Sequence, residues 1–106
     1  WLAEALSNIV KNAIEHSPSG GSVVLTAEDN AVYTAISVRD FGQGMTSEEQ
    51  KYIFQRFYRS PYAGEDSIGI GLSLAKEIIE RQNGYLTVTS NPGEGTLMMI
   101  RFLKQG

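Results

Sequence analysis

The strongest constraint on the fold is a change in the period of the apolar residues along the chain. Over residues 2–16 apolar side chains recur every three or four positions, which predicts a helix with one broad apolar face. Residues 23–28 and 31–39 read instead as strands, and Asp29 and Asn30 between them predict the turn of a hairpin. A chain that alternates between these patterns has to bury helices against a sheet.

The second half of the chain repeats this alternation. Thr46 and Glu49 form the pattern of a capping box, which predicts a helix from there to about Phe57. Residues 60–68 have no periodicity and are expected to form a mobile loop. The remaining predicted elements are a helix at 72–82 and strands at 85–90 and 96–103. This order predicts an α+β domain with its helices on one face of the sheet.

Length, charge and composition exclude several classes of protein. The 106 residues suit one domain, and the absence of cysteine excludes disulfides, zinc–thiolate sites and thiol nucleophiles. A net charge of -3 argues against a nucleic-acid binder but not against a nucleotide ligand, because a helix N-terminus can hold phosphate without basic side chains. No apolar run approaches the roughly 20 residues that a membrane span requires.

The first predicted helix carries an unusual polar stripe. Glu4, Asn8, Asn12 and His16 are spaced four apart and therefore share one face. Asparagine is unfavourable inside a helix because its amide competes for backbone hydrogen bonds. The two asparagines thus indicate side chains aimed at a ligand or an ion, whereas the alternative interpretation is a tolerated solvent-exposed stripe.

Two pairs of glycines stand beside predicted elements, the first after a strand and the second before a helix. Gly42 and Gly44 come after Asp40, whose carboxylate at a strand end could accept a hydrogen bond from an amino group such as that of adenine. Gly69 and Gly71 directly precede a predicted helix, where exposed backbone N–H groups and the helix dipole favour phosphate. Taken singly, the first pair also fits an ordinary turn and the second a flexible start of a helix.

Arg59 stands at the end of the helix predicted to begin near Thr46. A cation at that position suits the helix dipole, and it could also reach a terminal phosphate.

Together these segments resemble the nucleotide-binding boxes of bacterial sensor histidine kinases. Residues 8–13, 40–45, 54–59 and 69–72 are similar, in order and spacing, to the N, G1, F and G2 boxes of that family. The resemblance extends over residues 2–103 and implies the Bergerat ATP-binding fold shared with gyrase, Hsp90 and MutL. In that fold three helices pack on one face of a mostly antiparallel mixed sheet, here without the usual first strand, as a two-layer sandwich.

The resemblance also implies roles for individual residues. Asp40 would bind the adenine amino group, supported by Thr96 through water, and Asn12 would hold Mg²⁺. Arg59 would meet the γ-phosphate, and Asn8, Asn12 and Arg59 would be the catalytic residues. The further nucleotide-binding positions that it implies are Asn8, His16, Gly42, Gly44, Gly69, Gly71 and Leu72.

The function implied by the resemblance is that of a protein-histidine kinase. Mg-ATP would donate its γ-phosphate to a histidine on a separate helical dimerisation domain, with a response regulator downstream. His16 lies in the nucleotide-site helix, so the phosphoacceptor is expected outside this chain. Residues 1–106 are then expected to be one ATP-binding domain, a monomeric, N-terminally truncated piece of a homodimeric bacterial kinase, on the cytoplasmic side of an inner-membrane sensor.

Two alternatives stay open at this stage. Bergerat ATPases and anti-sigma-type serine kinases carry a glutamate four residues before the metal-binding asparagine, whereas this chain has Asn8 before Asn12, and an amide cannot act as a general base. A non-catalytic nucleotide-binding or scaffold module is the other alternative. It is favoured by Glu15, which stands where these kinases often have a lysine near the phosphates and would repel them unless it points away or Mg²⁺ intervenes.

Overall fold

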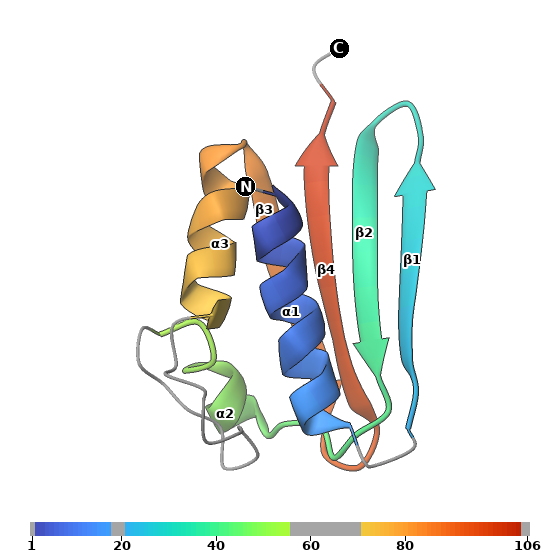
Figure 1. Ribbon diagram of the computed structural model, residues 1–106, viewed down its shortest axis with the longest axis vertical. Coiled ribbons are helices and arrows are strands. Elements are labelled where there is room, and N and C mark those ends of the chain that lie inside the picture. The colour runs from blue at the N-terminus through green and yellow to red at the C-terminus, as the bar shows by residue number, and fades with distance from the viewer. Residues whose placement is uncertain (1, 18–20, 56–70, 105–106) are drawn as a thin grey trace.

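The computed structural model describes residues 2–17, 21–55 and 71–104, and it has two layers, a sheet and a set of helices (Figure 1). The four strands are β1 (Val23–Asp29), β2 (Tyr33–Asp40), β3 (Gly84–Asn91) and β4 (Gly95–Leu103). They are arranged in the order β1-β2-β4-β3, and each neighbouring pair is antiparallel. The predicted α+β sandwich is therefore confirmed, although the described strands contain no parallel pair and thus form an antiparallel rather than a mixed sheet.

The helices α1 (Leu2–His16), α2 (Ser47–Gln50) and α3 (Gly71–Arg81) lie on one side of this sheet (Figure 1). The first and third helices agree with the prediction to within one residue. The second is much shorter than the predicted helix, which was expected to continue to Phe57, outside the described residues. Its capping box is present, since Glu49 N–H donates to Thr46 Oγ1 at 3.1 Å and Thr46 N–H donates to Glu49 Oε1 at 3.3 Å.

The reason for the early end of α2 lies in its backbone hydrogen bonds. The N–H of Lys51 donates to Glu48 O and that of Tyr52 to Glu49 O, at 3.1 and 3.0 Å. These are bonds between residues three apart, which tighten the chain into turns rather than continue an α-helix. A capping box therefore marked where the helix starts but carried no information about its length.

The core lies between the helices and the sheet. Small side chains on the facing surfaces of two helices, Ala5 on α1 and Ala75 on α3, are completely buried and let the helices approach closely. The largest fully buried side chains are Ile9, Ile79 and Ile100, one each from α1, α3 and β4. Burying a side chain of this size stabilises the fold by about 1.5–3 kcal/mol.

The predicted hairpin is confirmed, with β2 beginning two residues later than expected. The side-chain Oδ1 of Asn30 accepts the N–H groups of Val32 and Tyr33 at 2.8 and 2.9 Å, which closes the turn as an Asx turn. The strand β1 forms one edge of the sheet, and no further strand pairs with it among residues 2–17, 21–55 and 71–104. None of the described helices is long and apolar enough to span a bilayer.

Candidate nucleotide-binding site

A row of polar side chains crosses three strands at one end of the sheet. Asp40, the last residue of β2, pairs in register with Thr96 of β4, and Thr96 pairs with Ser90 of β3. Directly paired residues point to the same face of a sheet, here the face that also carries the core residue Val38 and is covered by the helices. Asp40 and Thr96 are the buried polar residues of the described structure, at 3% and 6% exposure.

The carboxylate of Asp40 is buried without a cationic partner. Its Oδ1 accepts the N–H of Gly42 at 3.0 Å, and the salt bridges within the described structure involve other carboxylates. The neighbouring Arg39 lies over the ring of Phe41 instead, 5.2 Å from its centroid. A buried charge is costly unless it is paired and hydrogen-bonded. The geometry therefore leaves Asp40 Oδ2 as an acceptor that suits a donor brought in by a ligand.

The glycines after Asp40 bring two other segments up to the site. A Cβ on Gly42 would lie 1.8 Å from the backbone oxygen of His16, so the end of α1 packs directly against this loop. A Cβ on Gly44, whose φ is 72°, would lie 2.0 Å from the backbone oxygen of Asn91. These close approaches give both glycines a packing requirement within the protein, which the sequence pattern did not reveal.

The polar stripe of α1 connects this end of the site to the start of α3. His16 lies beside Gly42, whereas Asn8 lies beside Gly71, where an added Cβ would be 3.8 Å from the Cβ and Cγ of Asn8. Along a helix the separation of eight positions from Asn8 to His16 corresponds to about 12 Å. Asn8, Asn12 and His16 are each half-buried. The stripe therefore joins the two glycine-marked regions that the sequence analysis treated separately.

The side chains of this stripe differ in their hydrogen bonds. The ring Nδ1 of His16 lies 2.9 Å from the backbone oxygen of Asn12. By contrast, the side-chain amides of Asn8 and Asn12 have no hydrogen-bond partner in the part of the chain that the structure describes. Because neither amide is hydrogen-bonded to the described residues, both suit a ligand or an ion bound with it.

The beginning of α3 supplies the backbone donors of the site. Gly71 is the first residue of the helix, and Leu72 packs against the hydrophobic core and so fixes the helix start in place. The N–H groups of a first helical turn have no partner within the helix, and the dipole there favours anions. The other two predicted phosphate-site residues, Gly69 and Arg59, lie outside the described residues, as does the predicted loop at 60–68.

Two residues that the sequence did not reveal, Gln50 and Ser90, form hydrogen bonds that connect the loop after Asp40 to β3. Gln50 Nε2 donates to the backbone oxygens of Met45 and Ser90, at 3.1 and 3.0 Å. Ser90 Oγ accepts the N–H of Met45 at 2.8 Å, and Gly93 N–H donates to Gln43 O at 2.6 Å. The loop after Asp40 is thus fixed to the turn between β3 and β4. No local sequence signal marks these contacts, because their partners are up to 50 residues away in the chain.

Comparison with known proteins identifies the family. The whole chain, residues 1–106, matches the histidine kinase-, DNA gyrase B- and HSP90-like ATPases. The chain belongs to this family. Heme sensor protein HssS of Staphylococcus saprophyticus is 41% identical over 103 residues, which make up 97% of this chain and 22% of that protein. Sensor protein kinase PmrB of Pseudomonas aeruginosa is 44% identical over 86 residues, 79% of this chain and 18% of that protein.

A solved structure supports the same assignment. The mycobacterial sensor histidine kinase MprB superposes with a TM-score of 0.83 at 26% identity, over 94% of this chain and 70% of that chain. The resemblance to histidine kinases and the Bergerat-type fold are therefore confirmed, and the chain is an ATP-binding catalytic domain of the histidine-kinase type. It spans about a fifth of the length of the curated relatives that it matches.

The donor set of this ATPase domain suits magnesium bound together with phosphate. The described residues contain no group of three or more His, Asp or Glu side chains that could hold a metal by themselves. Magnesium usually takes one or two protein oxygens, several waters and the phosphates of a substrate. An amide oxygen such as that of Asn12 fits this requirement, one helical turn from Asn8, which lies beside the phosphate-favouring start of α3.

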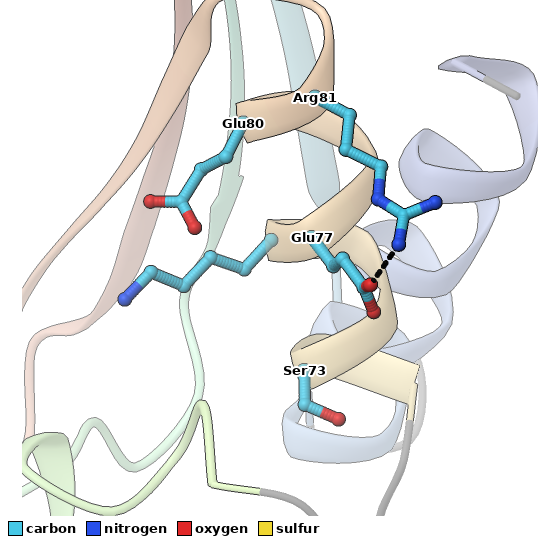
Figure 2. Close-up of a pocket in the computed structure, with 5 residues that line it drawn as sticks. Ser73, Glu77, Glu80 and Arg81 are labelled. Atoms are coloured by element: carbon cyan, nitrogen blue, oxygen red, sulfur yellow. Dashed lines mark hydrogen bonds and ion pairs between the residues drawn. The ribbon is translucent and has the colours of Figure 1, made fainter.

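A shallow hollow elsewhere on the domain does not suit a nucleotide. It is lined by residues of α3 alone, with the side chains of Glu77 and Arg81 paired at 2.7 Å (Figure 2). The lining side chains are Ser73, Lys76, Glu77, Glu80 and Arg81. Their two positive and two negative charges cancel, so the hollow has no preference for an anion. The chemistry around Asp40 suits a nucleotide better than that of this hollow.

Proposed function

We propose that this ATPase domain binds Mg-ATP along the polar stripe of α1 and donates the γ-phosphate to a histidine on a separate dimerisation domain of a two-component sensor kinase. The observation that carries the proposal is the buried, cation-free carboxylate of Asp40 at one end of the stripe, with the start of α3 at the other. This arrangement offers an acceptor for a base and donors for phosphate at a separation of about 12 Å along the helix.

At the base end, Asp40 accepts a hydrogen bond from the amino group of adenine. Thr96 stands directly across the strand pair and supports the same contact. His16, at the end of α1, lies where its ring can stack on or donate to the base. Gly42 and Gly44 shape the floor of this end by holding the loop against two backbone carbonyls.

At the phosphate end, Asn12 supplies an amide oxygen to Mg²⁺, and Asn8 lies one turn further, beside Gly71. The bound ion would neutralise phosphate charge as it develops during transfer. The N–H groups at the start of α3, with Leu72 anchored in the core, hold the phosphates. Gly69 and Arg59 complete the proposal, Arg59 as the cation for the γ-phosphate.

The mechanism is positioning with charge neutralisation, because phosphoryl transfer requires little covalent work by the protein. Asn8 cannot take a proton from water, so hydrolysis should be slow compared with transfer to a phosphoacceptor. The ring of His16 is directed back onto its own helix through the contact of Nδ1 with Asn12 O. His16 lies within the helix that carries the proposed nucleotide site, so the phosphorylated histidine is expected on a partner domain.

The wider assignment follows from the relatives. Those named here are sensor proteins and sensor kinases, and the chain matches only part of each. We propose a parent that is a homodimeric bacterial inner-membrane sensor with this domain in the cytoplasm. A response regulator would receive the phosphate from the parent, and residues 1–106 alone would act as one monomeric domain.

Calorimetric titration with ADP and with a non-hydrolysable ATP analogue, each with and without Mg²⁺, tests the binding step. Loss of magnesium-dependent binding in Asn12→Ala, and of binding altogether in Asp40→Ala, is the expected result. Transfer is then tested by adding ATP labelled at the γ-phosphate together with a histidine-bearing dimerisation domain of a relative. No binding at millimolar nucleotide would contradict the proposal, and binding without transfer to any histidine domain would favour a scaffold module.

A further inference from the structure

We propose that Ser90 determines the base specificity of the site by fixing the direction in which the hydroxyl of Thr96 points its proton. The inference rests on the proposed function, in that a nucleotide base binds beside Asp40 and Thr96. It assigns to Ser90, a residue that does not itself need to touch the base, the role of a positioning residue.

The hydroxyl of Ser90 has three polar neighbours. It lies 2.8 Å from the N–H of Met45, 2.8 Å from the backbone oxygen of Gly95 and 2.9 Å from Thr96 Oγ1. A serine hydroxyl has one proton and two acceptor lone pairs. The carbonyl of Gly95 can only accept, so the Ser90 proton points to it. The N–H of Met45 can only donate, so it occupies one lone pair.

These assignments leave one arrangement for the third neighbour. With its proton already donated to Gly95 O, Ser90 can only accept from Thr96, so the Thr96 proton points toward Ser90. The oxygen of Thr96 then presents lone pairs alone to the rest of its surroundings. Ser90 thereby turns an ambivalent hydroxyl into an acceptor.

The neighbour of Thr96 on its other side is also an acceptor. Thr96 pairs directly with Asp40 across β2 and β4, and both are buried. A site edged by a carboxylate and an acceptor-only hydroxyl binds a donor, such as the 6-amino group of adenine. It repels the 6-oxo group of hypoxanthine or guanine. A water that donates its two hydrogens to these two residues presents its own lone pairs, so it selects in the same direction.

The surrounding structure holds Ser90 in this role. The amide of Gln50 donates to the backbone oxygen of Ser90 at 3.0 Å and ties it to α2. Gly95 has a φ of 85°, and a Cβ there would lie 2.2 Å from the backbone oxygen of Asp40. Gly95, together with Thr96, which follows it in the chain and pairs with Asp40, is therefore held close to Asp40.

The test compares ADP with inosine 5′-diphosphate, which differ at position 6 of the base, by calorimetric titration of the intact chain. Wild type is expected to prefer ADP strongly. In Ser90→Ala the Thr96 proton is freed to face the base, and the ratio of the two dissociation constants should fall about tenfold. Ser90→Thr keeps the hydroxyl and should restore the ratio.

Two further variants separate specificity from general damage. Ser37→Ala is a matched control, because Ser37 also contacts a threonine hydroxyl, that of Thr26, but on the opposite face of the sheet. In Thr96→Val the residue through which Ser90 acts is gone, so adding Ser90→Ala to that variant should leave the ratio where Thr96→Val alone put it.

An unchanged ratio in a folded Ser90→Ala protein, with both nucleotides weakened equally, would overturn the inference and leave Ser90 a structural residue. The inference would also be overturned if the double variant discriminated less between the two nucleotides than Thr96→Val alone. Failure of the wild type to bind ADP would instead count against the proposed function. If Ser90→Ala does not fold, the comparison of Ser90→Thr with Ser90→Cys, whose thiol is a weak donor, decides the question through the same ratio.

Discussion

The two ends of the candidate site are built differently. At the base end the hydroxyl of Ser90 is saturated with hydrogen bonds and Asp40 is almost completely buried. At the phosphate end Asn8 and Asn12 are only half-buried, and their amides have no hydrogen bond within the described residues. In the proposed binding mode, the base end is therefore formed before the ligand arrives, and the polar groups of the phosphate end would be satisfied by the ligand and its ion.

The largest expected effect tests the rigidity of the base end. Gly44→Ala would place a Cβ 2.0 Å from the backbone oxygen of Asn91 at a positive φ, so we expect it to lower the free energy of unfolding by about 3 kcal/mol. The matched control is Gly93→Ala, which has a φ of 83° but open space around it, with an expected cost of about 1 kcal/mol. Thermal unfolding measures both, and equal losses would show that the close packing of Gly44 is unimportant.

The second prediction separates binding from stability at Asp40. Asp40→Asn removes a buried charge without a cationic partner, so the free energy of unfolding should stay the same or rise. The affinity for ADP should fall by about 10- to 100-fold, because a charge-assisted hydrogen bond to the base is lost. Calorimetric titration and thermal unfolding of the same sample test both parts. A large loss of stability would indicate that the carboxylate supports the fold rather than a ligand.

The counterpart at the phosphate end is Asn12→Ala. The amide of Asn12 makes no hydrogen bond with residues 2–17, 21–55 or 71–104, so stability should change by less than about 0.5 kcal/mol. Binding of the ATP analogue should lose its dependence on Mg²⁺, while binding of ADP without Mg²⁺ is unaffected. Titration with and without the ion measures this, and a loss of magnesium-free ADP binding would contradict the division of the site into two ends.

The link between α2 and the base end is tested by Gln50→Met. The change keeps the approximate length of the side chain and removes its donations to Met45 O and Ser90 O, at an expected cost of about 1–2 kcal/mol in unfolding free energy. Affinity for ADP should weaken in parallel. Gln55→Met, at an exposed position further along the chain, is the control. Unaltered ADP affinity in Gln50→Met would mean that the base end is held without α2.

The smallest effect is expected for Glu15, which lies two helical turns beyond Asn8 on the same side of α1. Replacing it with glutamine removes a negative charge from the face of α1 that carries the proposed site, and affinity for ADP without Mg²⁺ should rise about twofold, an effect that salt should screen. Glu28→Gln, on the exposed strand β1, controls for net charge. A rise of the same size in the control would assign the effect to the charge of the whole domain.

The contrast between local patterns and long-range contacts explains which features could be predicted from the sequence. Helix periodicity identified α1 and its stripe, and the order of the boxes identified the family, because both are local patterns. Asp40 became a candidate through its place in these boxes, because the glycines that follow it also fit an ordinary turn. Ser90 and Gln50 were not, since their importance comes from partners 40 or more residues away that only the folded sheet brings together. The length of α2 also escaped prediction, because the chain beyond its cap turns instead of continuing as a helix.

The helix α1 connects the two ends of the candidate site. One face of it, with Ala5, Ile9 and Ala13, is clamped in the core, while the adjoining face carries polar groups to both ends of the site. Inserting one residue between Asn8 and Asn12 would turn the two parts of the helix by about 100° relative to each other and lengthen it by about 1.5 Å. In one of the two parts, either the side chains that pack in the core or those that face the ligand would then be misaligned. In the proposed binding mode, the number of residues in this one helix sets the distance that the nucleotide spans.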